Sequence, residues 1–280
     1  MIILTHTMTL ASSLSSSVRN RMPSRWLVVL ALLVGALVAM PVLAVLLQVL
    51  SPSDTVDTWS HLASTVLPDY LWSTLWLCLG VGLGTASMGV GAAWLVTRYD
   101  FPLRGTLEWA LVLPLAVPGY VMAYTYTDLL QFVGPVQTWL RDTFEWTRAD
   151  YWFPDVRSLG GAVVLFSLVL YPYVYMLART AFLERAGGML EVGRVLGLGP
   201  WGSFFRVSLP LARPAIAAGV SLALMETLAD FGAVSYFGVQ TFTTGIYRAW
   251  FSLGDRVAAA QLASTLLGFV VLVLMFERLS

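Results

Sequence analysis

The chain has 280 residues, of which 58% are hydrophobic and only 11% are charged. Soluble globular domains carry roughly 25% charged residues, so this composition excludes an ordinary soluble domain and indicates a membrane protein. The formal net charge is zero and no basic stripe occurs, which argues against nucleic acid as a partner. The lone cysteine, Cys78, cannot form an internal disulfide, and no Cys/His spacing predicts a metal centre or a cofactor.

Six stretches are apolar and long enough to cross a bilayer as helices, which takes about 20 residues. In chain order they are 26–50, 70–96, 109–130, 159–177, 214–236 and 258–276. The first is longer than the roughly 7–15-residue apolar core of a signal peptide, so we expect a retained helix after a cytoplasmic tail, 1–25. In the second, Gly80 and Gly84 favour close helix packing. In the third, Pro114 and Pro118 should kink or open the helix.

The placement of arginine predicts the orientation of these spans, because positive residues concentrate in cytoplasmic loops. With six spans, eleven of the 16 arginines lie on the side of the two termini and five lie on the other side. The segment 51–69 contains three aspartates and no arginine. We therefore expect an all-α, multi-pass protein of a bacterial inner membrane, with both termini in the cytoplasm.

The connection between the fourth and fifth spans, 179–213, is about 35 residues long and should contain structure of its own. Apolar residues recur through 183–198 at spacings that suit an amphipathic helix. Gly197, Gly199 and Pro200 should end that helix, and 201–209 can form a second short helix that ends at Pro210. The prediction is a helix-turn-helix on the cytoplasmic face.

Within this connection the run Glu191-Val192-Gly193, then Gly197, then nine residues and Val207-Ser208-Leu209-Pro210, resembles the "EAA" loop of ABC importer permeases. In that family the loop docks into a groove of the cytoplasmic ATPase and transmits its closure to the membrane helices. The resemblance implies that the coupling residues here are Glu191, Gly193, Gly197, Leu209 and Pro210. Val192-Gly193 stands where the family has a pair of small alanines. The alternative is an amphipathic helix that rests on lipid headgroups.

Longer runs resemble the iron(III) permeases of the same superfamily. These runs are 94–102, 113–120 with 126–130, 226–232 and 238–247, and the resemblance covers about 70–278. It implies the type I ABC importer permease fold, a periplasmic solute-binding protein and a separate ATPase, since the chain contains no GxxxxGK[ST]. Iron(III) permeases usually fuse two six-helix halves, whereas one loop motif is present here. We expect a second permease half as a partner, or a truncated or split gene product.

Acidic residues in or near the spans are candidates for function, because an ionisable group at the centre of a membrane helix costs roughly 2.5–3.5 kcal/mol. Glu226 and Asp230 are four residues apart and should share one helix face. With Asp128 they could line a path for a hard cation. The alternative is that each acid bonds a neighbouring helix or a backbone amide and fixes packing. Glu108 and Asp128 lie near span ends and could instead reach lipid headgroups. The tyrosines 171, 173 and 175, near the cytoplasmic end of the fourth span, are expected to form an interfacial aromatic belt.

We therefore expect a tail, 1–25, a first helix with its periplasmic loop, 26–69, and a permease domain, 70–278, that contains the coupling loop 179–213. The leading hypothesis is the permease subunit of an iron(III) importer, not itself an enzyme. One alternative is the same machinery for thiamine, a polyamine or sulfate. Another is an ion-coupled secondary transporter that uses Glu226 and Asp230 as a relay, although the long cytoplasmic loop argues against it. An intramembrane enzyme would need a catalytic signature that the sequence lacks.

Overall fold

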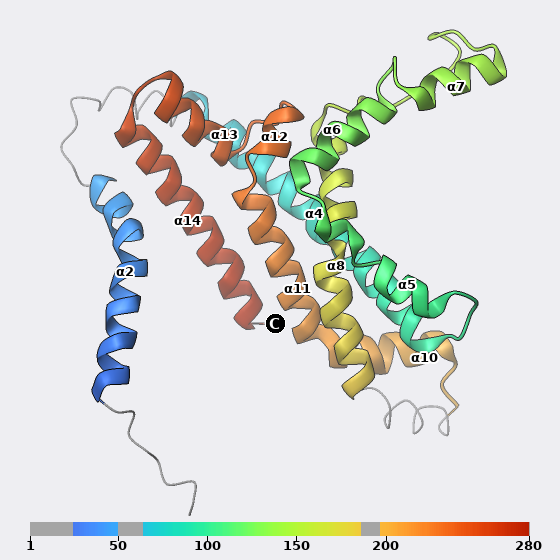
Figure 1. The fold of residues 1–280 in the computed structure, drawn as a ribbon, viewed down its shortest axis with the longest axis horizontal. Helices are drawn as coiled ribbons and strands as arrows, with labels where there is room; N and C mark the ends of the chain where they lie inside the picture. Colours follow the sequence, from blue (N-terminus) through green and yellow to red (C-terminus); the bar gives the residue numbers. More distant parts are fainter. Residues whose placement is uncertain (1–24, 50–63, 186–196, 280) are drawn as a thin grey trace, which may run out of the picture. The chain divides into compact units, whose positions relative to one another are not determined.

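A computed structural model of the chain describes residues 25–49, 64–185 and 197–279, and within these ranges it contains helices and no strand (Figure 1). The chain divides into two units near residue 47, and each is described by itself. The described part of the first unit is α2 (Arg25–Val49), which contains Pro41 and carries no charge after Arg25. At about 1.5 Å per residue its 25 residues are long enough to cross a bilayer, as expected.

The core of the second unit consists of α4 (Leu67–Arg98), α8 (Leu159–Arg185) and α11 (Leu209–Ala229). Gly80 and Gly84 of α4 face Val163 and Ser167 of α8 so closely that a Cβ on either glycine would lie within 3.0 Å of the facing side chain. These contacts confirm the predicted close packing, and they show that α4 and α8 run parallel. Gly219 brings α11 against α8, since a Cβ there would lie 2.7 Å from the Val174 Cα. Glu226, later on α11, lines one cavity with Phe166, earlier on α8, so the two helices run in opposite directions.

The remaining helices flank this core (Figure 1). They are α5 (Arg104–Ala110), the 3-10 turn η1 (Leu113–Ala116), α6 (Gly119–Leu130), α7 (Pro135–Phe144), α10 (Pro200–Ser203), the π turn η2 (Phe204–Ser208), α12 (Gly232–Tyr236), α13 (Phe242–Tyr247), the π turn η3 (Arg248–Ser252) and α14 (Arg256–Leu279). Among the described residues five helices are long and apolar enough to span a membrane, or six if one broken pair counts as a single span.

The broken pair is the third predicted span. The part before Ala116 and the part after Gly119 are bent by 99° relative to each other. Val117 is extended, with φ −106° and ψ 126°, because the residue before a proline is displaced from helical geometry. The sequence prediction of an opened helix at Pro114 and Pro118 is confirmed.

Two other predictions about helix ends are wrong. The helix after Gly199 does not end at Pro210 but continues through Pro214 to Ala229. In the π turn the Leu209 N–H donates to the Phe204 carbonyl, and Pro210 then lies in the first turn of α11, where its missing N–H is tolerated. The fifth span ends at Ala229 rather than at 236, since Asp230 is extended, with ψ 134°.

The second unit has two ends, which we name by their contents. The loop end holds the C-termini of α4 and α8, together with α5 and α10, and the far end holds α7, α12 and α13 (Figure 1). The arginines at the loop end are Arg98, Arg104, Arg179, Arg206 and Arg213, and those at the far end are Arg141, Arg148, Arg157, Arg248 and Arg256. Five of the eleven arginines assigned to the side of the termini therefore lie at one end of this unit, and the five assigned to the other side lie at its opposite end.

Candidate translocation cavity and coupling surface

A cavity of about 210 Å³ lies where the broken span meets α8 and the end of α11. Its walls combine apolar side chains with three oxygen-bearing ones, and the lining residues are Leu115, Val117, Pro118, Gly119, Phe166, Val169, Leu170, Tyr173, Glu226 and Asp230. The cavity exists because Val117 and Pro118 interrupt the span and because α11 stops before Asp230. Glu226 and Asp230 thus share a cavity, as the sequence suggested, but they do not share a helix.

Asp230 is held by backbone amides. Its Oδ1 accepts hydrogen bonds from the N–H groups of Ala233 and Val234, at 2.9 and 3.0 Å, and so caps the start of α12. Its carbonyl oxygen accepts a further bond from the Thr243 hydroxyl at 2.7 Å. This arrangement is the packing role that the sequence left open as an alternative. Aspartate is also one of the residue types that mark the start of a helix in sequence.

Glu226 occupies a different environment in the same cavity. It is an exposed residue on the last turn of α11, and no backbone amide of the described residues caps its carboxyl group. The phenol of Tyr173, which also lines the cavity, interacts with this carboxyl group. Tyr173 is therefore a cavity residue rather than part of an interfacial belt. Within the described residues, no group of three His, Cys, Asp or Glu side chains could hold a metal ion.

Asp128 does not line this cavity. It lies near the C-terminus of α6, where its Oδ1 accepts a hydrogen bond from the Gln131 Nε2 at 3.1 Å. The three acids proposed for one path are thus divided by the structure. Glu226 and Asp230 meet at the break in the third span, and Asp128 lies toward the far end.

At the loop end a network of charges ties α5 to α8. Arg179 Nη2 donates to Glu108 Oε2 at 2.9 Å, and the two side chains are 32% and 24% exposed. Arg104 Nε lies 3.4 Å from Glu108 Oε1, and Arg104 also pairs with Asp100. The buried Tyr175 donates its hydroxyl to the Glu108 carbonyl oxygen at 3.2 Å. Glu108 therefore does not reach for headgroups, and Tyr175 is not part of an aromatic belt.

Residues on both sides of the segment 186–196 meet on one tryptophan. The ring of Trp94, 5% exposed, lies 5.7 Å from that of Phe182 near the end of α8 and 5.0 Å from that of Phe204 at the start of η2. Trp201 and Phe205 stack on each other beside this cluster and remain exposed. No local pattern in the sequence predicts this anchor, because its three members are separated by about 90 and 20 residues.

The coupling residues expected from the resemblance are only partly described. Glu191 and Gly193 lie outside the described residues, as does most of the amphipathic helix expected over 183–198. Gly197 has φ +81°, a left-handed conformation that favours glycine. Leu209 and Pro210 form the first turn of α11, directly after the π turn.

Comparison with known proteins agrees with this architecture. Residues 85–279 match the family described as "Binding-protein-dependent transport system inner membrane component". The Fe(3+)-transport system permease protein FbpB 2 of Haemophilus influenzae is 29% identical over 258 residues, which cover 92% of this chain and 46% of that protein. The molybdenum transport system permease protein ModB of Escherichia coli is 31% identical over 208 residues, 70% of this chain and 87% of that one. The chain thus spans about half the length of the iron(III) relative and most of the molybdenum relative.

Solved structures show the same fold. A chain of a bacterial alginate ABC transporter in complex with its pentasaccharide-bound periplasmic protein superposes with a TM-score of 0.70 at 15% identity, over 90% of this chain and 92% of that one. A chain of the MetNI methionine ABC transporter in an inward-facing conformation superposes with a TM-score of 0.56 at 17% identity, over 81% and 96%.

The helices, the broken span and the cavity beside it define a polytopic, all-α membrane transport protein. The chain belongs to the family of binding-protein-dependent transport system inner membrane components, the permeases of ABC importers, and has the type I fold.

Proposed function

We propose that this chain is one half of the membrane pathway of an importer driven by a separate cytoplasmic ATPase. The loop end then faces the cytoplasm, together with both termini, and the far end receives solute from a periplasmic binding protein. A second permease half completes the pathway. The excess of arginine in the segments assigned to the cytoplasm supports this orientation.

One observation carries the coupling role. Both flanks of the 186–196 segment pack on Trp94, and the Glu108–Arg179 pair fastens the preceding helix to α5. A docking segment must be held at both ends if a partner's movement is to reach the membrane helices rather than be absorbed by a loose loop. We assign the docking contacts to Glu191, Gly193 and Gly197, and the connection to the membrane to Leu209 and Pro210.

Two glycines that differ in backbone conformation provide the test. Gly197 and Gly199 both have open space where a Cβ would lie, but Gly197 has φ +81° whereas Gly199 has φ −69°. Gly197→Val should reduce co-purification of the ATPase, and Gly199→Val should leave it unchanged. Charge reversal at Glu191 should act like Gly197→Val. If both Gly197→Val and the Glu191 variant retain the ATPase as well as the wild type, the coupling assignment is wrong.

For the solute we propose iron(III), on the long runs that resemble iron(III) permeases and on the relative that matches 92% of this chain. The carboxyl group of Glu226 and the phenol of Tyr173 offer hard oxygen ligands in the cavity. The molybdenum relative supports an oxyanion as the second candidate. Uptake of labelled iron, molybdate and sulfate by cells that carry the complete importer separates them, and iron uptake that survives Glu226→Gln rejects the cation path.

A further inference from the structure

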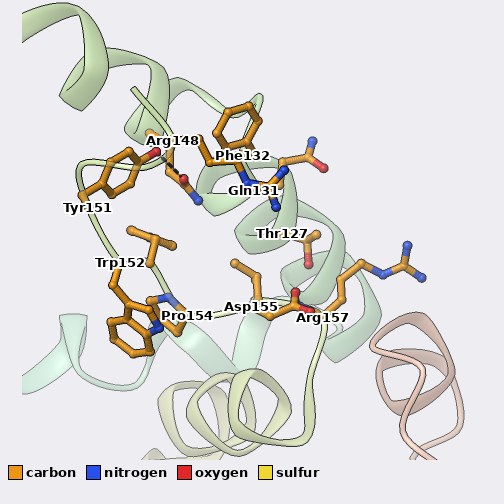
Figure 2. Close-up of a pocket in the computed structure, with 12 residues that line it drawn as sticks. Thr127, Gln131, Phe132, Arg148, Tyr151, Trp152, Pro154, Asp155 and Arg157 are labelled. Atoms are coloured by element: carbon orange, nitrogen blue, oxygen red, sulfur yellow. Dashed lines mark hydrogen bonds between the residues drawn. The ribbon is translucent and has the colours of Figure 1, made fainter. Parts of the chain in front are cut away.

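Two adjoining cavities at the far end differ sharply in chemistry. The first, of about 410 Å³, is lined by polar and aromatic side chains that include Arg148, Tyr151 and Arg157 (Figure 2). The second, of about 220 Å³, is lined mainly by apolar side chains of α6 and α8. The four consecutive residues 153–156 line both cavities, so the two cavities lie side by side with this segment between them. A ligand that fills both must have a polar and an apolar part.

The apolar cavity runs along the start of a membrane span. Its lining on α8 extends from Gly160 to Leu168, and α8 begins its span at Leu159. At about 1.5 Å per residue this is about 12 Å of helix, within a segment apolar enough to cross a membrane. Val164, one of the lining residues, is 59% exposed, so the cavity opens on the surface of the unit.

The polar cavity lies just outside that span, at the level of headgroups. Aromatic side chains gather around it, as they do at membrane interfaces. Phe144, Trp146 and Tyr151 form a stack with centroid separations of 4.7 and 5.7 Å, and Trp152 at the rim is 85% exposed. Trp139 of the neighbouring helix α7 is exposed as well.

The polar groups of this cavity fall into two sets. Gln137 and Tyr151 are bonded to each other, and Gln137 also donates to the Leu130 carbonyl. The guanidinium of Arg148, in contrast, lies 5.2 Å from the centroid of the Phe132 ring, over which Arg141 also lies, and no carboxylate of the described residues forms an ion pair with it. The buried hydroxyl of Thr127, in the same wall, has no hydrogen-bond partner among the described residues.

Charge also constrains the ligand. Arg157 is directed at the Tyr236 carbonyl, to which its Nε and Nη2 donate at 3.1 and 2.8 Å, and like Arg148 it has no carboxylate partner among the described residues. Asp155 is the one acid that lines the cavity. Its carboxylate accepts the backbone N–H of Arg157, and its carbonyl oxygen accepts the Ser158 hydroxyl. Figure 2 shows Arg148 and Gln131 on one side of the cavity and Asp155 with Pro154 on the other. The guanidinium of Arg148 on one side and the carboxylate of Asp155 on the other complement a phosphate that carries a nearby ammonium group.

We propose that the paired cavities bind one phospholipid of the leaflet at the far end, with its phosphate on Arg148 and an acyl chain along α8 between Gly160 and Leu168. Asp155 receives the ammonium of a phosphoethanolamine headgroup. The lipid fills the space between α6, the 151–158 segment and α8, and so supports the end of the broken span. This site is separate from the cavity at Glu226 and from the coupling loop.

Native mass spectrometry of the full chain tests the proposal, with phosphatidylethanolamine or phosphatidylglycerol of the same acyl composition as the probe. Arg148→Gln should weaken retention of phosphatidylethanolamine about tenfold, since a charge-assisted hydrogen bond is lost. Val164→Phe, which narrows the apolar cavity without touching a charge, should also weaken it. Asp155→Asn should remove the preference for phosphatidylethanolamine over phosphatidylglycerol and leave total retention largely unchanged.

Matched controls lie on other surfaces of the same unit. Arg256→Gln changes an arginine that stands 5.6 Å from the Trp250 ring at the far end, and Leu79→Phe changes an exposed residue of α4, and neither position lines the two cavities. Both variants should retain lipid like the wild type. Equal retention by Arg148→Gln and Val164→Phe would overturn the proposal. Displacement of the lipid by inorganic phosphate alone would also overturn it, since the site would then hold a free anion. A dimer of this chain that Val164→Phe dissociates would overturn it as well, since the apolar cavity would then hold a second copy.

Discussion

Replacing Glu108 by glutamine should loosen the attachment of α5 to α8. The carboxylate of Glu108 accepts a bond from Arg179 and lies beside Arg104, and the Nε atoms of both arginines are buried without a hydrogen-bond partner among the described residues. Glu108→Gln leaves two cations without their shared anion, whereas Arg179→Gln removes one cation and leaves Glu108 with Arg104. We expect the first substitution to lower the free energy of unfolding more than the second.

The exposure of the pair sets the size of the effect. Fully exposed ion pairs contribute roughly 0–1 kcal/mol, and hydrogen bonds to charged groups with limited solvent contact contribute roughly 1.5–3 kcal/mol. Arg179 and Glu108 are 32% and 24% exposed, so an intermediate coupling energy of about 1–2 kcal/mol follows. That energy corresponds to a factor of about 5–30 in the equilibrium between attached and detached α5.

A double-mutant cycle measures this coupling directly. Glu108→Gln, Arg179→Gln and the double variant are unfolded in mixed micelles, and the free energies are compared with that of the wild type. A coupling energy below about 0.3 kcal/mol, within the range of simple additivity, would refute the reasoning. Asp100→Asn is the matched control, because Asp100 is 93% exposed and its loss should have little effect.

Three further substitutions test other parts of the unit. Gly89→Val should prevent α4 and α8 from packing, since a Cβ there would lie 2.7 Å from the Val174 Cβ and 2.9 Å from the Tyr171 carbonyl oxygen. The control Gly91→Val meets open space and should yield normal amounts of monodisperse protein, which Gly89→Val should not. Asp230→Ala should cost about 0.5–2 kcal/mol of stability through loss of the α12 cap, and Asp230→Asn should restore most of it; equal stability of both variants would contradict the cap. Trp94→Ala should cost about 3–5 kcal/mol and increase proteolysis near Phe182 and Phe204, and an unchanged digestion pattern would argue against the anchor.

The parts of the fold that can be predicted from sequence are those that depend on local pattern. Hydropathy locates the spans, the Gly80 and Gly84 spacing locates a helix contact, and the prolines locate the break in the third span, because each signal acts within a few residues. The helix ends around Pro210 and Asp230 differ from the sequence prediction. A π turn and a capping carboxyl group decide them, and helical periodicity contains neither.

Contacts between distant residues cannot be predicted in this way. Glu108 and Arg179 are 71 residues apart, and in the sequence the arginine serves only as a marker of orientation. The separation of Asp128 from the cavity likewise follows from the 99° bend, whose direction is set by tertiary packing rather than by the prolines themselves. Sequence identifies which residues carry chemistry, and packing decides which of them meet.

The position of the Glu108–Arg179 pair connects the loop end to the cavity. On α8, Tyr173 lies six residues before Arg179, about 9 Å along the helix, and it lines the cavity. On the other side of the ion pair, Leu115 of η1 follows Glu108 by seven residues and lines the same cavity. A displacement of the end of α8 moves the cavity wall at Tyr173. If the ion pair holds, the wall at Leu115 moves with it, and if the ion pair breaks, the two walls separate. Glu108→Gln distinguishes the two cases under the proposed coupling role. If the wall at Leu115 moves with α8 only through the ion pair, the variant should keep the proposed ATPase bound but lose ATP-driven solute uptake.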